Sequence, residues 1–161
     1  MDILVKGDSN MTLTTKETGL LKDLKTQEQL CIEKYTQNAQ RACSNELKDL
    51  FNSLAQVERE HLKTVNEMMG GKVPSVPSQI SGNNCNCACA NYTDEDKKKN
   101  DAFLCQDMLT AEKHASSLYD TCVFEFTDPQ ARKMLNHIQA EEQQHGEKIY
   151  TYMSNNNMMT N

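Results

Sequence analysis

The amino-acid sequence predicts an all-α protein, a four-helix bundle made of two helical hairpins joined by a long crossover loop. Apolar residues recur at helical spacing through two long segments, and glycine and proline gather in one stretch between them. A chain of 161 residues lies in the range of one domain and can bury a core without a covalent staple. We therefore expect one domain that contains both hairpins.

Each half of the chain divides into two helices at a residue that favours a helix start. Serine and aspartate are preferred N-cap residues, and proline suits the first helical position. These preferences place breaks at Ser44 and at Asp128, which precedes Pro129. The expected helices cover residues 16–43, 45–69, 96–127 and 129–154.

The crossover loop is expected over residues 70–95, where most of the glycine and proline lies. Some 25 residues of irregular chain, at about 3.3 Å per residue, can run the length of a bundle between its second and third helices. The bundle would then cover residues 13–154, with flexible ends at residues 1–12 and 155–161. The alternative is a homodimer that swaps hairpins between two chains, which the long loop also permits.

The net charge and the hydropathy of the sequence indicate which partners and which location to expect. The net charge of -6 and the pI near 5.2 argue against a surface for nucleic acid or for an anionic membrane. Mean hydropathy is low, at -0.73, and no apolar stretch approaches the length of a membrane helix. The first 20 residues lack the apolar core of a signal peptide. We therefore expect a soluble protein that is synthesised in the cytoplasm.

Seven cysteines are present, an odd number without an export signal, so we expect thiols and not a disulfide scaffold. Four of them lie in the expected helices and are predicted to be small core residues: Cys31, Cys43, Cys105 and Cys122. The other three alternate with polar or small residues in the loop, at Cys85, Cys87 and Cys89. Their spacing does not match a zinc knuckle, and both a flexible cross-linking loop and a soft-metal site remain open.

The two halves of the chain share polar residues at a constant offset of 84 positions. Among the coinciding pairs are Glu28 with Glu112, Tyr35 with Tyr119, Glu58 with Glu142, and His61 with His145. The expected N-caps Ser44 and Asp128 also coincide. An amphipathic repeat alone has no reason to keep polar residues in register, so the pattern indicates two related hairpins with a shared polar feature.

The coinciding residues predict a dinuclear metal site. A Glu-x-x-His pair places a carboxylate and an imidazole on one helix face, and each half carries one such pair plus a glutamate on its first helix. This is the ligand pattern of di-iron and di-manganese carboxylate bundles, in which two divalent cations cancel four carboxylate charges. The predicted ligands are Glu28, Glu58, His61, Glu112, Glu142 and His145. We expect two iron ions, with manganese as the alternative.

By the same pattern, Glu58 and Glu142 would bridge the metals, while Glu28 and Glu112 would be terminal ligands. Tyr35 and Tyr119 are candidate donors to the terminal carboxylates, with core packing as the alternative for both.

Other residues near these motifs leave alternatives open. Glu60 and Glu141 adjoin the motifs and could replace their neighbours as ligands, although the offset favours Glu58 and Glu142. His137 could approach the site from two helical turns away, but surface or packing roles are expected for His114 and His137. An ordinary bundle with these polar residues at its surface explains each residue singly but not their shared offset.

The stretches from Glu28 to His61 and from Glu112 to His145 resemble the rubrerythrin and bacterioferritin side of the ferritin-like superfamily. Over residues 12–154 the sequence is more similar still to the spore coat protein F family of endospore-forming bacteria. That likeness is carried by residues 15–23, 46–51 and 136–145. Ala115 stands where rubrerythrins have a further glutamate, and no rubredoxin domain is present, so rubrerythrin-type peroxidase turnover is not implied.

The resemblance implies a ferritin-like protein of the spore coat, with coat proteins as partners. If the predicted site holds iron, the protein would react with peroxide or dioxygen as an oxidoreductase of peroxidase or ferroxidase type. The alternative is a structural coat component without turnover, in which metal is missing or only stabilises the bundle. The sequence does not decide whether the protein is an enzyme.

Overall fold

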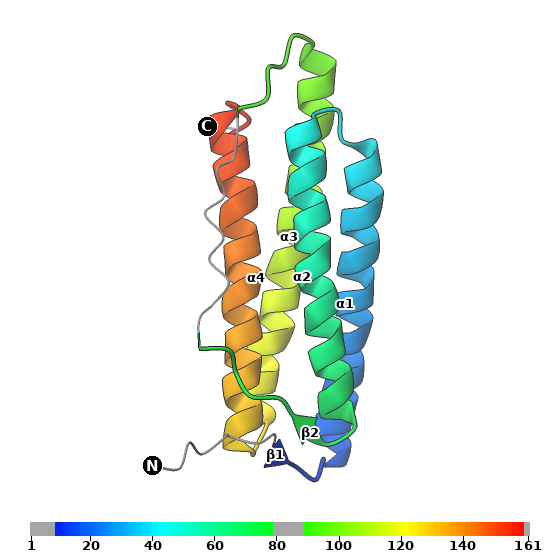
Figure 1. The fold of residues 1–161 in the computed structure, drawn as a ribbon, viewed down its shortest axis with the longest axis vertical. Helices are drawn as coiled ribbons and strands as arrows, with labels where there is room; N and C mark the ends of the chain where they lie inside the picture. Colours follow the sequence, from blue (N-terminus) through cyan, green and yellow to red (C-terminus); the bar gives the residue numbers. More distant parts are fainter. Residues whose placement is uncertain (1–8, 79–88, 160–161) are drawn as a thin grey trace, which may run out of the picture.

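A computed structural model describes residues 9–78 and 89–159 of the chain. Its four long helices form one bundle, which confirms the all-α prediction (Figure 1). They are α1 (Thr15–Arg41), α2 (Asn45–Met69), α3 (Glu95–Glu125) and α4 (Pro129–Asn155). Two short strands, β1 (Ser9–Asn10) and β2 (Lys72–Val73), pair at one end of the bundle.

The helices are arranged as two antiparallel hairpins, α1 with α2 and α3 with α4, and α1 also packs against α3. Helix α2 ends at the same end of the bundle where α1 begins, whereas α3 begins at the opposite end (Figure 1). The end of α2 and the start of α3 therefore lie at opposite ends of the bundle, which is the arrangement of a ferritin-like bundle with one long crossover.

Side chains of the preceding residue cap each helix start. The Ser44 hydroxyl accepts the N–H of Leu47, and the Asp128 carboxylate accepts the N–H groups of Gln130 and Ala131. Both residues are the N-caps that the sequence indicated. Asp94 caps α3 in the same way, and this places the start of α3 at Glu95, one residue before the expected position.

The short connection between α1 and α2 is held by a buried carboxylate of α3. The Asp101 carboxylate accepts the backbone N–H groups of Cys43 and Ser44, at 2.7 and 2.9 Å. These bonds end α1 at Arg41, two residues before the expected end, and leave the Cys43 side chain exposed. The prediction that Cys43 is a core residue was therefore wrong.

The other three cysteines of the helices are buried, as predicted: Cys31, Cys105 and Cys122. Cys89 is exposed, and its thiol donates to the Asn155 carbonyl at 3.6 Å. Cys85 and Cys87 lie outside the described residues.

Residues at both ends of the described chain make contacts with other segments. Ser9 and Asn10 pair with Val73 and Lys72, and the N–H of Met11 donates to the Gly71 carbonyl at 2.8 Å. Gly71 has φ +83°, and a Cβ there would lie 2.9 Å from the Met11 carbonyl oxygen, so glycine is required for this close approach.

The C-terminal segment after α4 folds back onto the bundle. The N–H of Met158 donates to the Met153 carbonyl at 2.9 Å, and the Met158 side chain is buried in the core. The Asn156 amide oxygen accepts the N–H of Ala90 at 2.9 Å, which joins this segment to the end of the crossover. The buried methionine holds the described residues after α4 against the bundle.

The apolar core is divided into two clusters by a layer of buried polar residues. One cluster contains Tyr35, Phe51 and Tyr152, near the connection between α1 and α2. The other contains Leu21, Val65 and Leu135, near the opposite end. The polar layer between them holds the residues that the sequence predicted as metal ligands.

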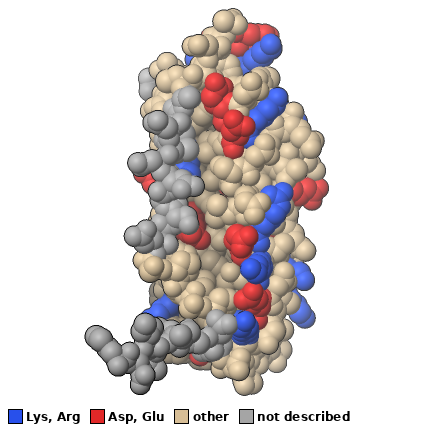
Figure 2. Space-filling view, in the orientation of Figure 1, with Lys and Arg blue, Asp and Glu red and all other residues tan. Residues whose placement is uncertain are grey.

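Acidic and basic side chains are interleaved on the face shown in Figure 2, without an extended field of one sign. Within the described residues, no helix is long and apolar enough to cross a membrane.

Candidate metal centre

The six predicted ligands come together at one level of the bundle. Each of the four helices contributes at least one of them, and every one of the six side chains is at most 3% exposed. On α2 and α4 the Glu-x-x-His spacing directs both side chains inward, because residues three apart share a helix face. Two groups of four potential ligand atoms result, with the atoms of each group within 4.8 Å of one another.

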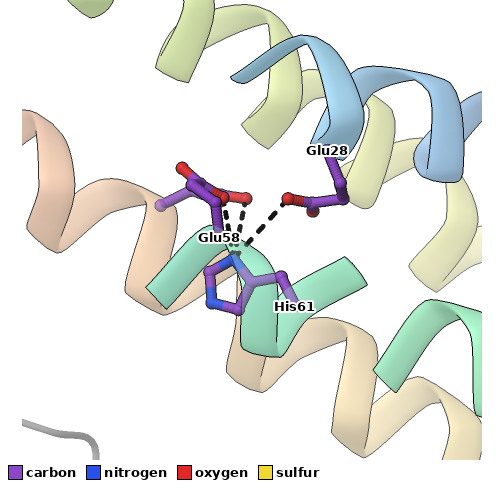
Figure 3. A group of neighbouring side chains, drawn as sticks. Glu28, Glu58 and His61 are labelled. Carbon is purple, nitrogen blue, oxygen red and sulfur yellow. Dashed lines mark hydrogen bonds and ion pairs between the residues drawn. The ribbon is translucent and has the colours of Figure 1, made fainter. Parts of the chain in front are cut away.

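One group surrounds Nδ1 of His61. In Figure 3 this nitrogen points toward the carboxylates of Glu28 and Glu58. Its distances are 3.1 Å to Glu58 Oε2, 3.4 Å to Glu142 Oε1 and 3.8 Å to Glu28 Oε2. A single N–H can satisfy only one of these oxygens well, so the convergence is better suited to a cation than to hydrogen bonding alone.

The second group surrounds Nδ1 of His145 and repeats the first. Its distances are 3.1 Å to Glu58 Oε1, 3.3 Å to Glu142 Oε2 and 3.4 Å to Glu112 Oε1. The two imidazole rings lie nearly parallel, with their centroids 5.6 Å apart. Glu58 and Glu142 thus direct one oxygen to each histidine, whereas Glu28 and Glu112 each serve one side only. The ligand pattern predicts the same division for bound metals, with Glu58 and Glu142 as bridging carboxylates and Glu28 and Glu112 as terminal ones.

Two tyrosines hold the terminal carboxylates, and their hydrogen bonds cross between the hairpins. Tyr35 of α1 donates its hydroxyl to Glu112 of α3, and Tyr119 of α3 donates to Glu28 of α1. Both tyrosines are fully buried. They therefore do more than fill the core, because each fixes the orientation of a carboxylate at the centre.

Four carboxylate oxygens of the centre have no hydrogen-bond partner within the described part of the chain: Glu28 Oε2, Glu112 Oε2, Glu142 Oε1 and Glu142 Oε2. The two oxygens of Glu142 approach the imidazoles closely, but not in hydrogen-bond geometry. An unsatisfied buried carboxylate is costly to the folded state. Buried carboxylate oxygens without a hydrogen-bond partner are suited to act as ligands of a cation.

Burial and repulsion between carboxylates raise the pKa values of two of the four glutamates. The pKa of Glu28 and that of Glu112 are raised well above their ordinary value, first because burial disfavours the charged form and next because the Glu142 carboxylate lies close. Four carboxylates in one buried layer cannot all carry a charge without compensating cations.

The histidines stabilise charge on the bridging carboxylates. Burial opposes charge on Glu58, yet hydrogen bonds from His145 and His61 lower its pKa. The pKa of Glu142 is also lowered, because the nearby imidazoles outweigh burial and the Glu58 charge. Burial would by itself lower the pKa of His61 and of His145, but the surrounding carboxylates raise both.

Glu141 has a role that the sequence did not reveal. Its Oε2 lies 2.9 Å from Nε2 of His61, on the side of the ring away from the other carboxylates, and its pKa is lowered because this imidazole outweighs partial burial. His137 lies next in line, with Nε2 3.5 Å from Glu141 Oε1. A carboxylate on the second nitrogen of a histidine fixes its tautomer and ring orientation. His137 and Glu141 lie four residues apart on α4, whereas the contact of Glu141 with His61 joins α4 to α2 and has no spacing within one helix that would display it.

The remaining alternatives from the sequence are placed away from the centre. Glu60 and His114 are exposed, and neither belongs to the two groups of converging atoms. Glu141 also lies outside those groups, so the arrangement favours Glu58 and Glu142 over their neighbours.

By its fold and its buried residues, the protein is a four-helix bundle with a carboxylate and histidine cluster in its core. Residues 100–160, which contain most of α3 and all of α4, match the family model of the Coat F domain. The match covers less than half of the chain, and of the six clustered residues it includes Glu112, Glu142 and His145. Neither a curated protein nor a solved structure matches the chain.

Proposed function

We propose that this chain is a ferritin-like protein associated with the spore coat, and that its core binds two divalent metal ions, iron in preference to manganese. The observation that carries the proposal is the convergence of one imidazole nitrogen and three carboxylates on each of two points, with Glu58 and Glu142 shared between them. The match of the second hairpin to the Coat F domain supports the association with a coat and with coat proteins as partners.

The donor set fits iron or manganese. Carboxylate oxygen and imidazole nitrogen suit both metals, and four carboxylate oxygens of the cluster have lone pairs that no hydrogen bond from the described residues occupies. Glu28 and His61 would hold one ion, Glu112 and His145 the other, with Glu58 and Glu142 between the two. Tyr35 and Tyr119 would keep the terminal carboxylates in place during changes in the charge of the ions.

Two ferrous ions bound there would supply one electron each for the reduction of peroxide or dioxygen; with two protons, these two electrons would convert hydrogen peroxide to two water molecules. The protein's own contribution is to hold the ligands at fixed positions and to exclude bulk water. Its six ligand side chains are almost completely buried, so few competing reactions with solvent are expected there.

The proposal is tested by measuring metal bound per chain after anaerobic loading with ferrous iron. We expect about two ions for the wild type, as the ligand pattern requires, and loss of both in the double variant Glu58→Ala with His145→Ala. Glu147→Ala, at an exposed position of α4 that belongs neither to the cluster nor to a neighbouring groove, is the matched control and should bind as the wild type does. A wild type that binds neither iron nor manganese would refute the metal centre.

A structural coat component is the second candidate, and the Coat F match is the observation that favours it. The two candidates differ in redox behaviour. A protein that uses its metals for chemistry should be oxidised by peroxide and reduced again through many cycles, which the absorbance of ferric carboxylate species can follow. A structural protein should gain thermal stability from metal and show no repeated turnover.

A further inference from the structure

A groove of about 400 Å³ lies between α2 and α4, on the flank of the candidate centre. Residues Gln56, Glu60 and Thr64, each four positions apart on α2, form one wall, and His137 and Glu141 of α4 belong to the other. The segment after β2 contributes Pro74, Ser75 and Pro77 to the lining, and Figure 1 shows this segment running from the end of α2 toward α4.

The groove reaches the centre at one residue. His61 lines it, and of the six clustered side chains it alone does so within the described part of the chain. Its Nε2 faces Glu141 at 2.9 Å, while Nδ1 faces the bridging and terminal carboxylates (Figure 3). The imidazole of His61 is thus the partition between the groove and the centre.

The polar groups of the groove would attract a cation. Its titratable lining residues are two glutamates and two histidines, Glu60, Glu141, His61 and His137, with no lysine or arginine among the described lining. Glu60 is exposed, Glu141 is half-buried and His61 is buried, so oxygen and nitrogen donors follow one another from solvent to the interior. Beyond His61, Oε1 of the buried Glu142 lies 3.4 Å from the His61 Nδ1 and lacks a hydrogen-bond partner among the described residues.

We propose that this groove is the passage through which a hydrated divalent cation reaches the centre, and that Glu141 receives the cation before it passes His61. The inference rests on the proposed metal centre and adds a route to it. A cation that leaves water needs new ligands at each step, because an unpaired buried charge is very costly. Acidic walls also raise the local concentration of cations and their rate of association.

Glu141 is placed for this role by its two contacts. One carboxylate oxygen lies against His61 and the other lies 3.5 Å from His137, so the side chain connects an outer and an inner imidazole. A cation bound at Glu141 is one side chain away from the converging oxygens, and a rotation of the His61 ring would open the partition.

The test follows Co²⁺ uptake by anaerobic stopped-flow absorbance at low ionic strength, together with the amount bound at equilibrium. Glu141→Gln removes the receiving charge but keeps an amide of the same size, and Thr64→Trp narrows the groove. The matched controls are Glu33→Gln, an exposed carboxylate of α1, and Asn66→Trp, an exposed residue of α2 that does not line the groove.

We expect both groove variants to take up Co²⁺ at least about tenfold more slowly than their controls, with the same amount bound at the end. Uptake at the wild-type rate in both variants would overturn the passage while leaving the centre intact. A loss of bound metal in Glu141→Gln, in place of a slower rate, would make Glu141 a ligand and would also overturn the passage. A wild type that takes up no metal would refute the centre itself.

Discussion

At the scale of single residues, the two buried tyrosines decide how the terminal carboxylates are held. Each hydroxyl donates across the bundle, from Tyr35 to Glu112 and from Tyr119 to Glu28, so each half of the centre depends on a donor from the other hairpin. The sequence shows each tyrosine seven positions after a glutamate of its own helix, but it does not show which carboxylate each hydroxyl contacts. Antiparallel packing of α1 against α3 provides the partner on the opposite helix instead.

This crossed arrangement predicts selective effects of tyrosine substitutions. Tyr35→Phe removes the donor to Glu112 and should weaken binding at the Glu112 and His145 side by about 10–100-fold, while the other side is retained. Tyr119→Phe removes the donor to Glu28 and should weaken binding at the Glu28 and His61 side, while the Glu112 and His145 side is retained. Titration with Co²⁺, followed by absorbance, would resolve one weakened step and one unchanged step. Tyr150→Phe, at an exposed position, is the control, and equal weakening of both steps by either variant would contradict the crossed assignment.

Cysteine reactivity should follow burial closely. Burial raises the pKa of the Cys105 and Cys122 thiols to about 12, and it raises that of Cys31 further still, so few thiolates form there near neutral pH. Cys43 and Cys89 are exposed. Alkylation of the native protein with iodoacetamide, read by peptide mass spectrometry, should label the two exposed residues and spare the three buried ones. Labelling of Cys31 at the rate of Cys89 would contradict the burial described here.

At the scale of elements, the first turn of α1 is tied to the connection between α3 and α4 through Glu17. Its carboxylate accepts the backbone N–H groups of Thr14 and Thr127 as well as the Thr127 hydroxyl. Burial acts to raise the pKa of Glu17, but these hydrogen bonds outweigh it and lower the pKa from its usual value of 4.5. The Glu17 side chain therefore caps the start of α1 and also binds the connection between α3 and α4.

The lowered pKa of Glu17 sets the sign of a pH dependence. Its contribution to stability is complete above the unfolded-state pKa near 4.5 and is lost as the pH falls through the lower folded-state pKa. Glu17→Gln should cost about 1.5–3 kcal/mol of unfolding free energy at pH 7, and less at pH 3. Urea unfolding of both proteins at the two pH values measures this. Glu147→Gln, at an exposed position, is the control, and a cost that grows toward low pH would contradict the assignment.

The elements themselves follow largely from sequence. Apolar spacing predicts the helices, and the N-caps Ser44 and Asp128 locate two of their starts, because both signals act over a few neighbouring residues. The pairing of β1 with β2 and the burial of Met158 were not predicted, since each depends on a partner far away in the chain. The early end of α1 has the same origin, because the Asp101 carboxylate of α3 accepts the N–H groups of Cys43 and Ser44.

The candidate centre also has features that the sequence predicts and features that depend on contacts between distant segments. Its six residues could be selected because the offset of 84 preserves polar residues in two hairpins. The contact of Glu141 with His61 joins α4 to α2, and the groove beside it requires three separate segments. Neither feature has a spacing that a single helix would display.

At the scale of the whole molecule, the polar layer interrupts an otherwise continuous core. Apolar clusters lie on both sides of it, and their burial must offset the cost of four buried carboxylates. A core built for stability alone would be apolar at this level, since replacing buried ion pairs by apolar residues is often neutral or stabilising. The layer therefore indicates a function, which metal binding would supply.

If metal binding provides the compensation, then stability should depend on the metal concentration. A ligand that binds only the folded state stabilises it by about 2.7 kcal/mol at a concentration one hundred times the dissociation constant, which corresponds to roughly 5–10 °C in Tm for a chain of this size. We expect the wild type to melt at least that much higher in excess Mn²⁺ than after treatment with a chelator. The double variant Glu58→Ala with His145→Ala lacks ligands on both sides, so its Tm should be the same in both conditions. A Tm of the wild type that does not respond to Mn²⁺ or Fe²⁺ would mean that the polar layer is stabilised by its own hydrogen bonds and ion pairs, and the structural coat component would then be the better account of the molecule.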